Sequence, residues 1–155
     1  MPMKKEALFG VLMVCAIGTL FHFIYNWIPI FIFPQNESIF EHTKLVIFPF
    51  IIYGIYYLIR NKQDRRITFS SLISAIFVAI AIIVMGYYTY SGFIGKNIDA
   101  VNIILYYIGV IGGFLVFYKK KTLFSFYNSI IYCMILFIMI VVWSYFPPDL
   151  AFFLS

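Results

Sequence analysis

Residues 68–90 read TFSSLISAIFVAIAIIVMGYYTY and contain no charged side chain. A helix needs about 20 mostly apolar residues to cross the hydrocarbon layer of a bilayer. Four other segments have a similar character, so we expect spans at about residues 7–28, 39–59, 68–90, 100–118 and 125–146. The pattern predicts an all-α integral membrane bundle of five transmembrane helices, in which residues 1–155 form a single domain.

The composition favours a lipid environment over water. The chain is 64% hydrophobic and 11% charged, whereas about 25% of the residues of a soluble domain are charged. The lipid bilayer is therefore the expected partner, and the expected location is the cell membrane, with several passes. Although the net charge is +5, the basic residues lie in short segments between apolar spans, which argues against binding of nucleic acid.

The basic residues alternate between the two sides of the predicted bundle. Nine of them lie before span 1, between spans 2 and 3, and between spans 4 and 5, whereas only Lys44 and Lys96 lie on the other side. The positive-inside rule then predicts a cytoplasmic N-terminus and a C-terminus outside. A cleaved signal peptide ending near Ala16-Ile17-Gly18 is an alternative, but the apolar run continues well beyond this point and favours an uncleaved first span.

Polar residues collect at the predicted outer face. This face receives both histidines and four of the six acids, namely His22, His42, Glu37, Glu41, Asp99 and Asp149. Because ionisable residues are costly inside a membrane, they usually face the interior of the bundle and indicate a functional site. The predicted bundle therefore has one polar end, where any chemistry is expected.

The densest polar stretch is residues 36–44, NESIFEHTK, at the start of span 2. Ser38 and Glu41 have the spacing of a capping box, in which each side chain bonds the backbone N–H of the other residue. This structural role would account for Glu41 alone. Glu37 and His42 occupy positions where a hydrophobic staple usually packs, so we expect them to pair as carboxylate and imidazole.

Two more segments bring polar side chains to the same end. In span 1, His22 shares a helix face with Thr19 and Asn26, with Tyr25 alongside; a neutral His22 packed on tyrosine is the structural alternative. Before span 4, Asp99 or Asn97 could instead serve only as a helix cap.

Small residues suggest how the helices pack. Gly109 and Gly113 form G-x-x-x-G, a spacing that lets two helices approach closely. We expect this face either to contact span 3 or to form a homo-oligomer. Cys15 and Cys133 both fall within spans and have no metal-ligand spacing, so we interpret them as packing residues.

The polar segments resemble those of a family of small bacterial membrane proteins classed as a domain of unknown function. Its members carry a histidine in the first span, a P-V-N-E-S-x-W-E-H-x-K-L-like signature, a Y-T-Y-S-G-x-x-G-x-N stretch and a closing pair of prolines. Here these correspond to His22, residues 34–45, residues 88–97 and Pro147–Pro148. Gln35 and Phe40 depart from the signature, and the tail after the prolines is short. The resemblance implies the span count and supplies no activity.

Three hypotheses on function follow. The first is a polar site at the outer face that acts on a lipid or small ligand. This site would either bind a divalent metal such as zinc or perform acid–base chemistry. The second is a small transporter or channel in which Pro49 kinks span 2 and leaves the Leu45 carbonyl without its helical partner. The third is an accessory or structural subunit. The sequence does not decide whether the protein is an enzyme.

For the first hypothesis, the candidate residues fall into three groups. The acid–base candidates are Glu37, Glu41 and His42. The metal candidates are His22, His42 and Glu41. The candidates for contact with a ligand are His22, Tyr25, Asn26, Asn36, Lys44, Tyr90 and Asp99.

Overall fold

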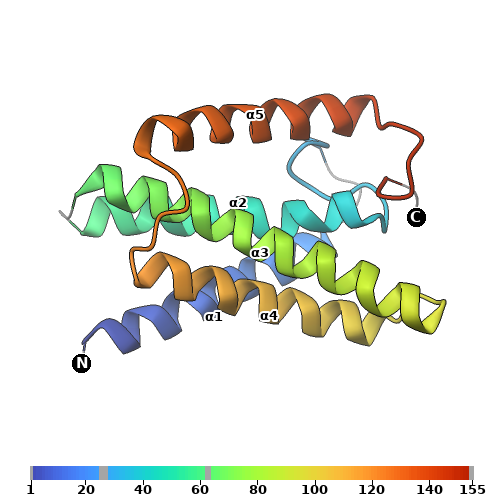
Figure 1. The fold of residues 1–155 in the computed structure, drawn as a ribbon, viewed down its shortest axis with the longest axis horizontal. Helices are drawn as coiled ribbons and strands as arrows, with labels where there is room; N and C mark the ends of the chain where they lie inside the picture. Colours follow the sequence, from blue (N-terminus) through green and yellow to red (C-terminus); the bar gives the residue numbers. More distant parts are fainter. Residues whose placement is uncertain (1, 25–27, 62–63, 154–155) are drawn as a thin grey trace.

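The structure, a computed structural model, describes residues 2–24, 28–61 and 64–153 and confirms the predicted all-α fold. Its helices are α1 (Pro2–Phe23), α2 (Ile39–Arg60), α3 (Arg65–Ile94), α4 (Asp99–Tyr118) and α5 (Phe126–Tyr145) (Figure 1). Each of these five helices is long and apolar enough to cross a membrane.

Local chemistry sets several helix ends. Asp64 caps α3, since its side chain accepts from the backbone N–H groups of Arg66 and Ile67. The same helix continues to Ile94, beyond the expected residue 90, and stops where Gly95 adopts a left-handed conformation with φ 77°. By contrast, α1 ends at Phe23, earlier than the expected residue 28.

The most extensive helix contact joins α3 and α4, which lie side by side (Figure 1). A Cβ atom added to Gly113 would lie 2.8 Å from the backbone oxygen of Ala75, and one added to Gly109 would lie 3.0 Å from that of Ala79. The predicted contact of the glycine face with span 3 is therefore confirmed. A homo-oligomer through Gly109 and Gly113 remains a prediction, and it would have to displace α3 from this face.

One face of α1 approaches α2 and α4. Its buried residues are Gly10, Val14 and Gly18, which are four apart and so share a face. A Cβ added to Gly18 would lie only 2.6 Å from the backbone oxygen of Leu45. Because His22 follows Gly18 at the same spacing, this face directs His22 toward α2.

The proline in α2 leaves one backbone carbonyl of this helix without its usual hydrogen-bond donor. Pro49 lies inside the helix and cannot donate to the carbonyl of Leu45. The hydroxyl of Tyr106 in α4 lies 3.5 Å from this oxygen and 3.2 Å from that of Val14. Tyr106 thus ties α4 to both neighbouring helices at the freed carbonyl.

The fifth helix packs on α3, and the tail that follows it returns to the start of α2. The backbone N–H of Phe40 donates to the carbonyl of Phe152 at 3.1 Å. The Phe40 ring packs against Trp143 and Phe153, with centroids 5.9 and 4.9 Å away. The short tail therefore supports the helix that begins the densest polar stretch.

Candidate functional site

The end of α1 and the start of α2 bring three candidate metal ligands together. His22, Glu37 and His42 each offer a ligand atom, and these atoms all lie within 4.8 Å of one another; we call this group the histidine cluster. The two imidazole rings are 5.7 Å apart between centroids. The cluster joins the last turn of α1 to the residues that open α2.

Two contacts orient the His42 ring. Its Nδ1 atom lies 2.9 Å from the backbone oxygen of Ser38, and its Nε2 atom lies 3.4 Å from a carboxylate oxygen of Glu37. Because a carbonyl oxygen can only accept, Nδ1 must carry a proton. In the neutral ring, the lone pair of Nε2 then faces the carboxylate of Glu37. The expected pairing of Glu37 with His42 is confirmed.

This arrangement calls for a positive charge between the two residues. A lone pair and a carboxylate oxygen repel each other unless a proton or a metal ion lies between them. The 3.4 Å separation is longer than a charge-assisted hydrogen bond of about 2.7–2.9 Å. A tetrahedral zinc ion with bonds of about 2.0–2.2 Å places its ligand atoms about 3.3–3.5 Å apart. The distance between His42 and Glu37 and the donor types of the cluster therefore fit a zinc-like ion, and the ligand atom of His22 lies within 4.8 Å of both.

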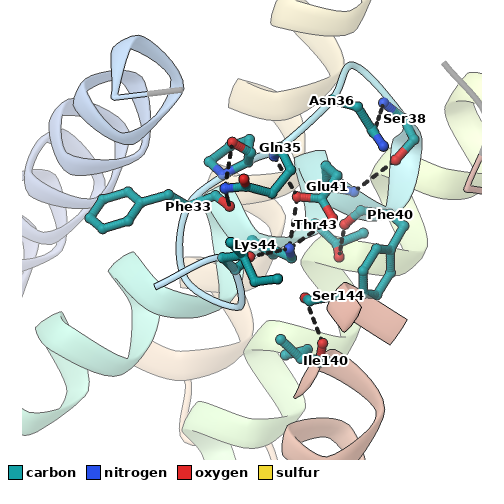
Figure 2. A network of polar contacts seen from close by, with 12 residues as sticks. Phe33, Gln35, Asn36, Ser38, Phe40, Glu41, Thr43, Lys44, Ile140 and Ser144 are labelled. Atoms are coloured by element: carbon teal, nitrogen blue, oxygen red, sulfur yellow. Dashed lines mark hydrogen bonds and ion pairs between the residues drawn. The ribbon is translucent and has the colours of Figure 1, made fainter. Parts of the chain in front are cut away.

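Glu41 is not a member of the histidine cluster. Its side chain is buried and lies 2.7 Å from the ammonium of Lys44. Lys44 is itself fully buried and also donates to the backbone oxygen of Ile30 at 2.8 Å. The backbone N–H of Gln35 donates to the carboxylate of Glu41 at 2.8 Å (Figure 2). Glu37, rather than the predicted Glu41, thus provides the carboxylate beside the two histidines.

The capping box forms only in part. Ser38 accepts from the backbone N–H of Glu41 at 3.3 Å, as predicted. The reciprocal bond is absent among the described residues, because the N–H of Ser38 donates to the side chain of Asn36 at 2.9 Å. Asn36 therefore stabilises the turn before α2, and Glu41 is available to hold Lys44.

A cavity of about 500 Å³ adjoins the histidine cluster and receives side chains from α1, α2, α3 and α4. Its polar lining includes Thr19, Asn97, Asp99 and Asn102 together with the cluster itself. Its apolar lining includes Phe23, Ile39, Leu45, Ile83, Ile103 and Leu105. The cavity is therefore amphipathic, with candidate metal ligands in its wall.

Tyr90 supports the part of this wall that α4 begins. Its hydroxyl lies 3.0 Å from the side-chain oxygen of Asn97, contacts that of Asn102, and accepts from the backbone N–H of Ile98 at 3.3 Å. Ile98 is the N-cap of α4 and has no side-chain cap, so neither Asn97 nor Asp99 serves as the cap. Asp99 is exposed and lines the cavity.

The structure thus divides the candidate residues into three sets. His22, Glu37, His42 and Asp99 line the cavity, whereas Asn36, Glu41, Lys44 and Tyr90 stabilise its surroundings. Tyr25 and Asn26 lie outside the described residues. Sequence reasoning did not single out Tyr106 of the cavity wall; the signal for it was the Leu45 carbonyl that Pro49 leaves free.

Comparison with known proteins places the whole chain in one family. No curated protein and no solved structure matched it. The model of the Family of unknown function (DUF6512) matches residues 1–155. Because the match covers the full length of the sequence, the chain belongs to this family of unknown function.

Proposed function

We propose that the protein binds a divalent metal ion of the zinc class through His22, Glu37 and His42, and uses the ion to hold a ligand in the adjoining cavity. The observation that carries this proposal is the orientation of His42, whose Nδ1–H is bound to the Ser38 carbonyl while Nε2 faces Glu37. A backbone acceptor on the second ring nitrogen is the usual support of a metal-bound histidine.

Three protein ligands leave a fourth position of a tetrahedral ion for water or a ligand. The ion would polarise an oxygen bound there, or lower the pKa of a bound water. Asp99 lines the same cavity and offers a carboxylate that accepts a proton or binds a hydroxyl. The site therefore suits a ligand that presents an oxygen to the metal.

The packing below the cavity supports a binding site more than a transport path. Tyr106 of the cavity wall contacts the backbone of Val14. One turn further along α1, a Cβ added to Gly10 would lie 2.7 Å from the ring of Tyr53. Among the described residues, the bundle at this level is filled by buried apolar side chains, including Val14, Val46, Phe50, Val110 and Phe114.

Elemental analysis of the detergent-purified protein tests the proposal. We expect about one zinc per chain in the wild type after incubation with the metal, and loss of bound zinc in His22→Ala, His42→Ala and Glu37→Gln. Asp149→Asn is the matched control, because this acid is exposed and lies outside the cluster.

Equal zinc content in the wild type and the three cluster variants would overturn the metal site. If the wild type bound no metal, the same geometry would favour an imidazolium–carboxylate pair that exchanges protons.

A further inference from the structure

The cavity beside the histidine cluster is bordered by side chains that are also exposed on the outside of the bundle. Phe23 at the end of α1 is 79% exposed, and Ile103 and Tyr107 in α4 are 56% and 39% exposed, yet all three line the cavity. A residue that lines a cavity and is also exposed on the outside of the bundle lies at the rim of the cavity opening. The cavity therefore opens sideways between α1 and α4, and it also opens at the polar end, where Glu37 and Asp99 are exposed and line it.

The surface around this opening is apolar. Next to the rim lie Leu20 on α1 and Ile104 and Ile108 on α4, which are 59%, 56% and 48% exposed. In a helix that crosses a membrane, exposed side chains of this kind face lipid. The opening thus connects the cavity to the hydrocarbon region, within about two helical turns of the polar end.

The lining of the cavity changes from polar at the helix ends to apolar deeper in the bundle. Its polar side chains belong to the end of α1, the start of α2 and the start of α4, whereas Leu45, Ile83 and Leu105 come from deeper in the helices. An occupant that enters from the side would meet apolar walls with one part and the histidine cluster with the other. This gradient suits an amphiphile better than a small polar solute.

Charge indicates which head group fits. Two neutral imidazoles and one carboxylate around a divalent ion leave a net charge of +1 at the metal centre; Asp99 lines the cavity but is not a member of the cluster. An anionic oxygen in the open position would neutralise the charge of the metal centre, and zinc accepts oxygen ligands as well as nitrogen ligands.

We propose that the ligand of this site is an anionic membrane lipid. Its phosphate binds the metal at His22, Glu37 and His42, while an acyl chain of the lipid leaves the cavity between α1 and α4. This inference rests on the proposed metal site and adds the class of ligand. It also assigns a role to Ile103 and Tyr107, which contact the acyl chain of the lipid at the rim of the cavity.

Binding measured by native mass spectrometry on the zinc-loaded full chain tests this assignment. The probe is dioctanoyl phosphatidic acid. Two partial probes serve for comparison: glycerol 3-phosphate has the phosphate head group without acyl chains, and dioctanoylglycerol has the acyl chains without the phosphate. We expect one bound phosphatidic acid per chain, and binding at least about tenfold weaker for either partial probe.

Two neighbouring substitutions separate the cavity from the general lipid-facing surface. Ile103→Trp fills the rim and should weaken binding of the probe by at least about tenfold. Ile104→Trp is the matched control, because Ile104 is equally exposed and does not line the cavity. Ile103→Phe is the smaller alternative if the tryptophan variant does not insert, and retained zinc shows that a variant is folded.

Different results would overturn the two proposals. Equal binding to Ile103→Trp and wild type, with zinc retained in both, would overturn the lateral lipid site alone. Equal affinity for glycerol 3-phosphate and phosphatidic acid would instead identify a soluble phosphate ligand. Absence of zinc from the wild type would overturn the proposed function and, with it, the metal-bound head group.

Discussion

The Nδ1 atom of His42 lies 2.9 Å from the backbone oxygen of Ser38, four residues earlier at the cap of α2. This bond turns the other ring nitrogen toward Glu37 and His22. Because the acceptor belongs to the backbone of the helix cap, the ring orientation is built into the start of α2.

The first prediction concerns the tautomer of His42. We expect nitrogen-15 NMR of histidine-labelled protein to show a proton on Nδ1 of His42, and a change at Nε2 when zinc is added. The chain has only two histidines, so a His22→Ala sample assigns the signals. A proton found on Nε2 of the neutral ring would contradict the inferred orientation.

The second prediction separates the two glutamates at the start of α2. Glu41→Gln leaves the buried ammonium of Lys44 without its carboxylate, so we expect a loss of about 3–5 kcal/mol in the free energy of unfolding. Glu37→Gln affects a side chain that is 60% exposed and should change stability by less than about 0.5 kcal/mol. Denaturation in mixed detergent micelles measures both.

A double variant checks that the effect of Glu41 comes from its ion pair. Lys44→Met with Glu41→Gln removes both charges, and it should be more stable than either single variant because no buried charge lacks its partner. Additive losses in the double variant would show that the two side chains act independently.

The five apolar helices could be predicted because their signals are local. Apolar runs indicate which segments form helices, and the Ser38–Glu41 spacing signals the start of α2. The pairing of Glu37 with His42 was also predictable, since both lie within one turn of that cap. These inferences need no knowledge of how separate helices are arranged.

The cavity and the partner of Glu41 could not be predicted in the same way. The cavity requires the relative positions of four helices, and no pattern within one helix contains that information. Glu41 and Lys44 are three residues apart and thus share a helix face, which was a usable signal for their pairing. Burial of the pair, however, depends on the segment at Ile30 and Gln35, which folds over α2.

The third prediction concerns the approach of α1 to α2. Gly18→Ala places a methyl group 2.6 Å from the Leu45 oxygen, so the helices must separate, at a cost of about 1–3 kcal/mol. Gly92→Ala is the control, because an added Cβ would meet no described atom within 4 Å, and it should be neutral or slightly stabilising. Thermal unfolding in detergent compares the two, and equal midpoints would argue against close packing at Gly18.

The fourth prediction concerns the tail. Phe153 is 6% exposed and packs between Phe40 and Trp143, so Phe153→Ala should cost nearly as much as a core substitution, about 3 kcal/mol. Phe146→Ala removes a ring that is 77% exposed and should have little effect. Because the tail bonds the first turn of α2, we also expect weaker zinc binding in Phe153→Ala. Unchanged stability and unchanged zinc affinity would indicate that the tail does not support the site.

The last prediction tests the orientation on which an outer site depends. In a background with Cys15 and Cys133 replaced by alanine, Asp149→Cys should react with a membrane-impermeant maleimide added to intact cells, because the positive-inside rule places this tail outside. Lys121→Cys is the matched control in the basic loop between α4 and α5, and it should react only after the membrane is permeabilised. Both positions are exposed, so a difference in labelling reports the side of the membrane and not burial. The reverse pattern would place the histidine cluster on the cytoplasmic side, where its metal and lipid would have to come from the cell interior.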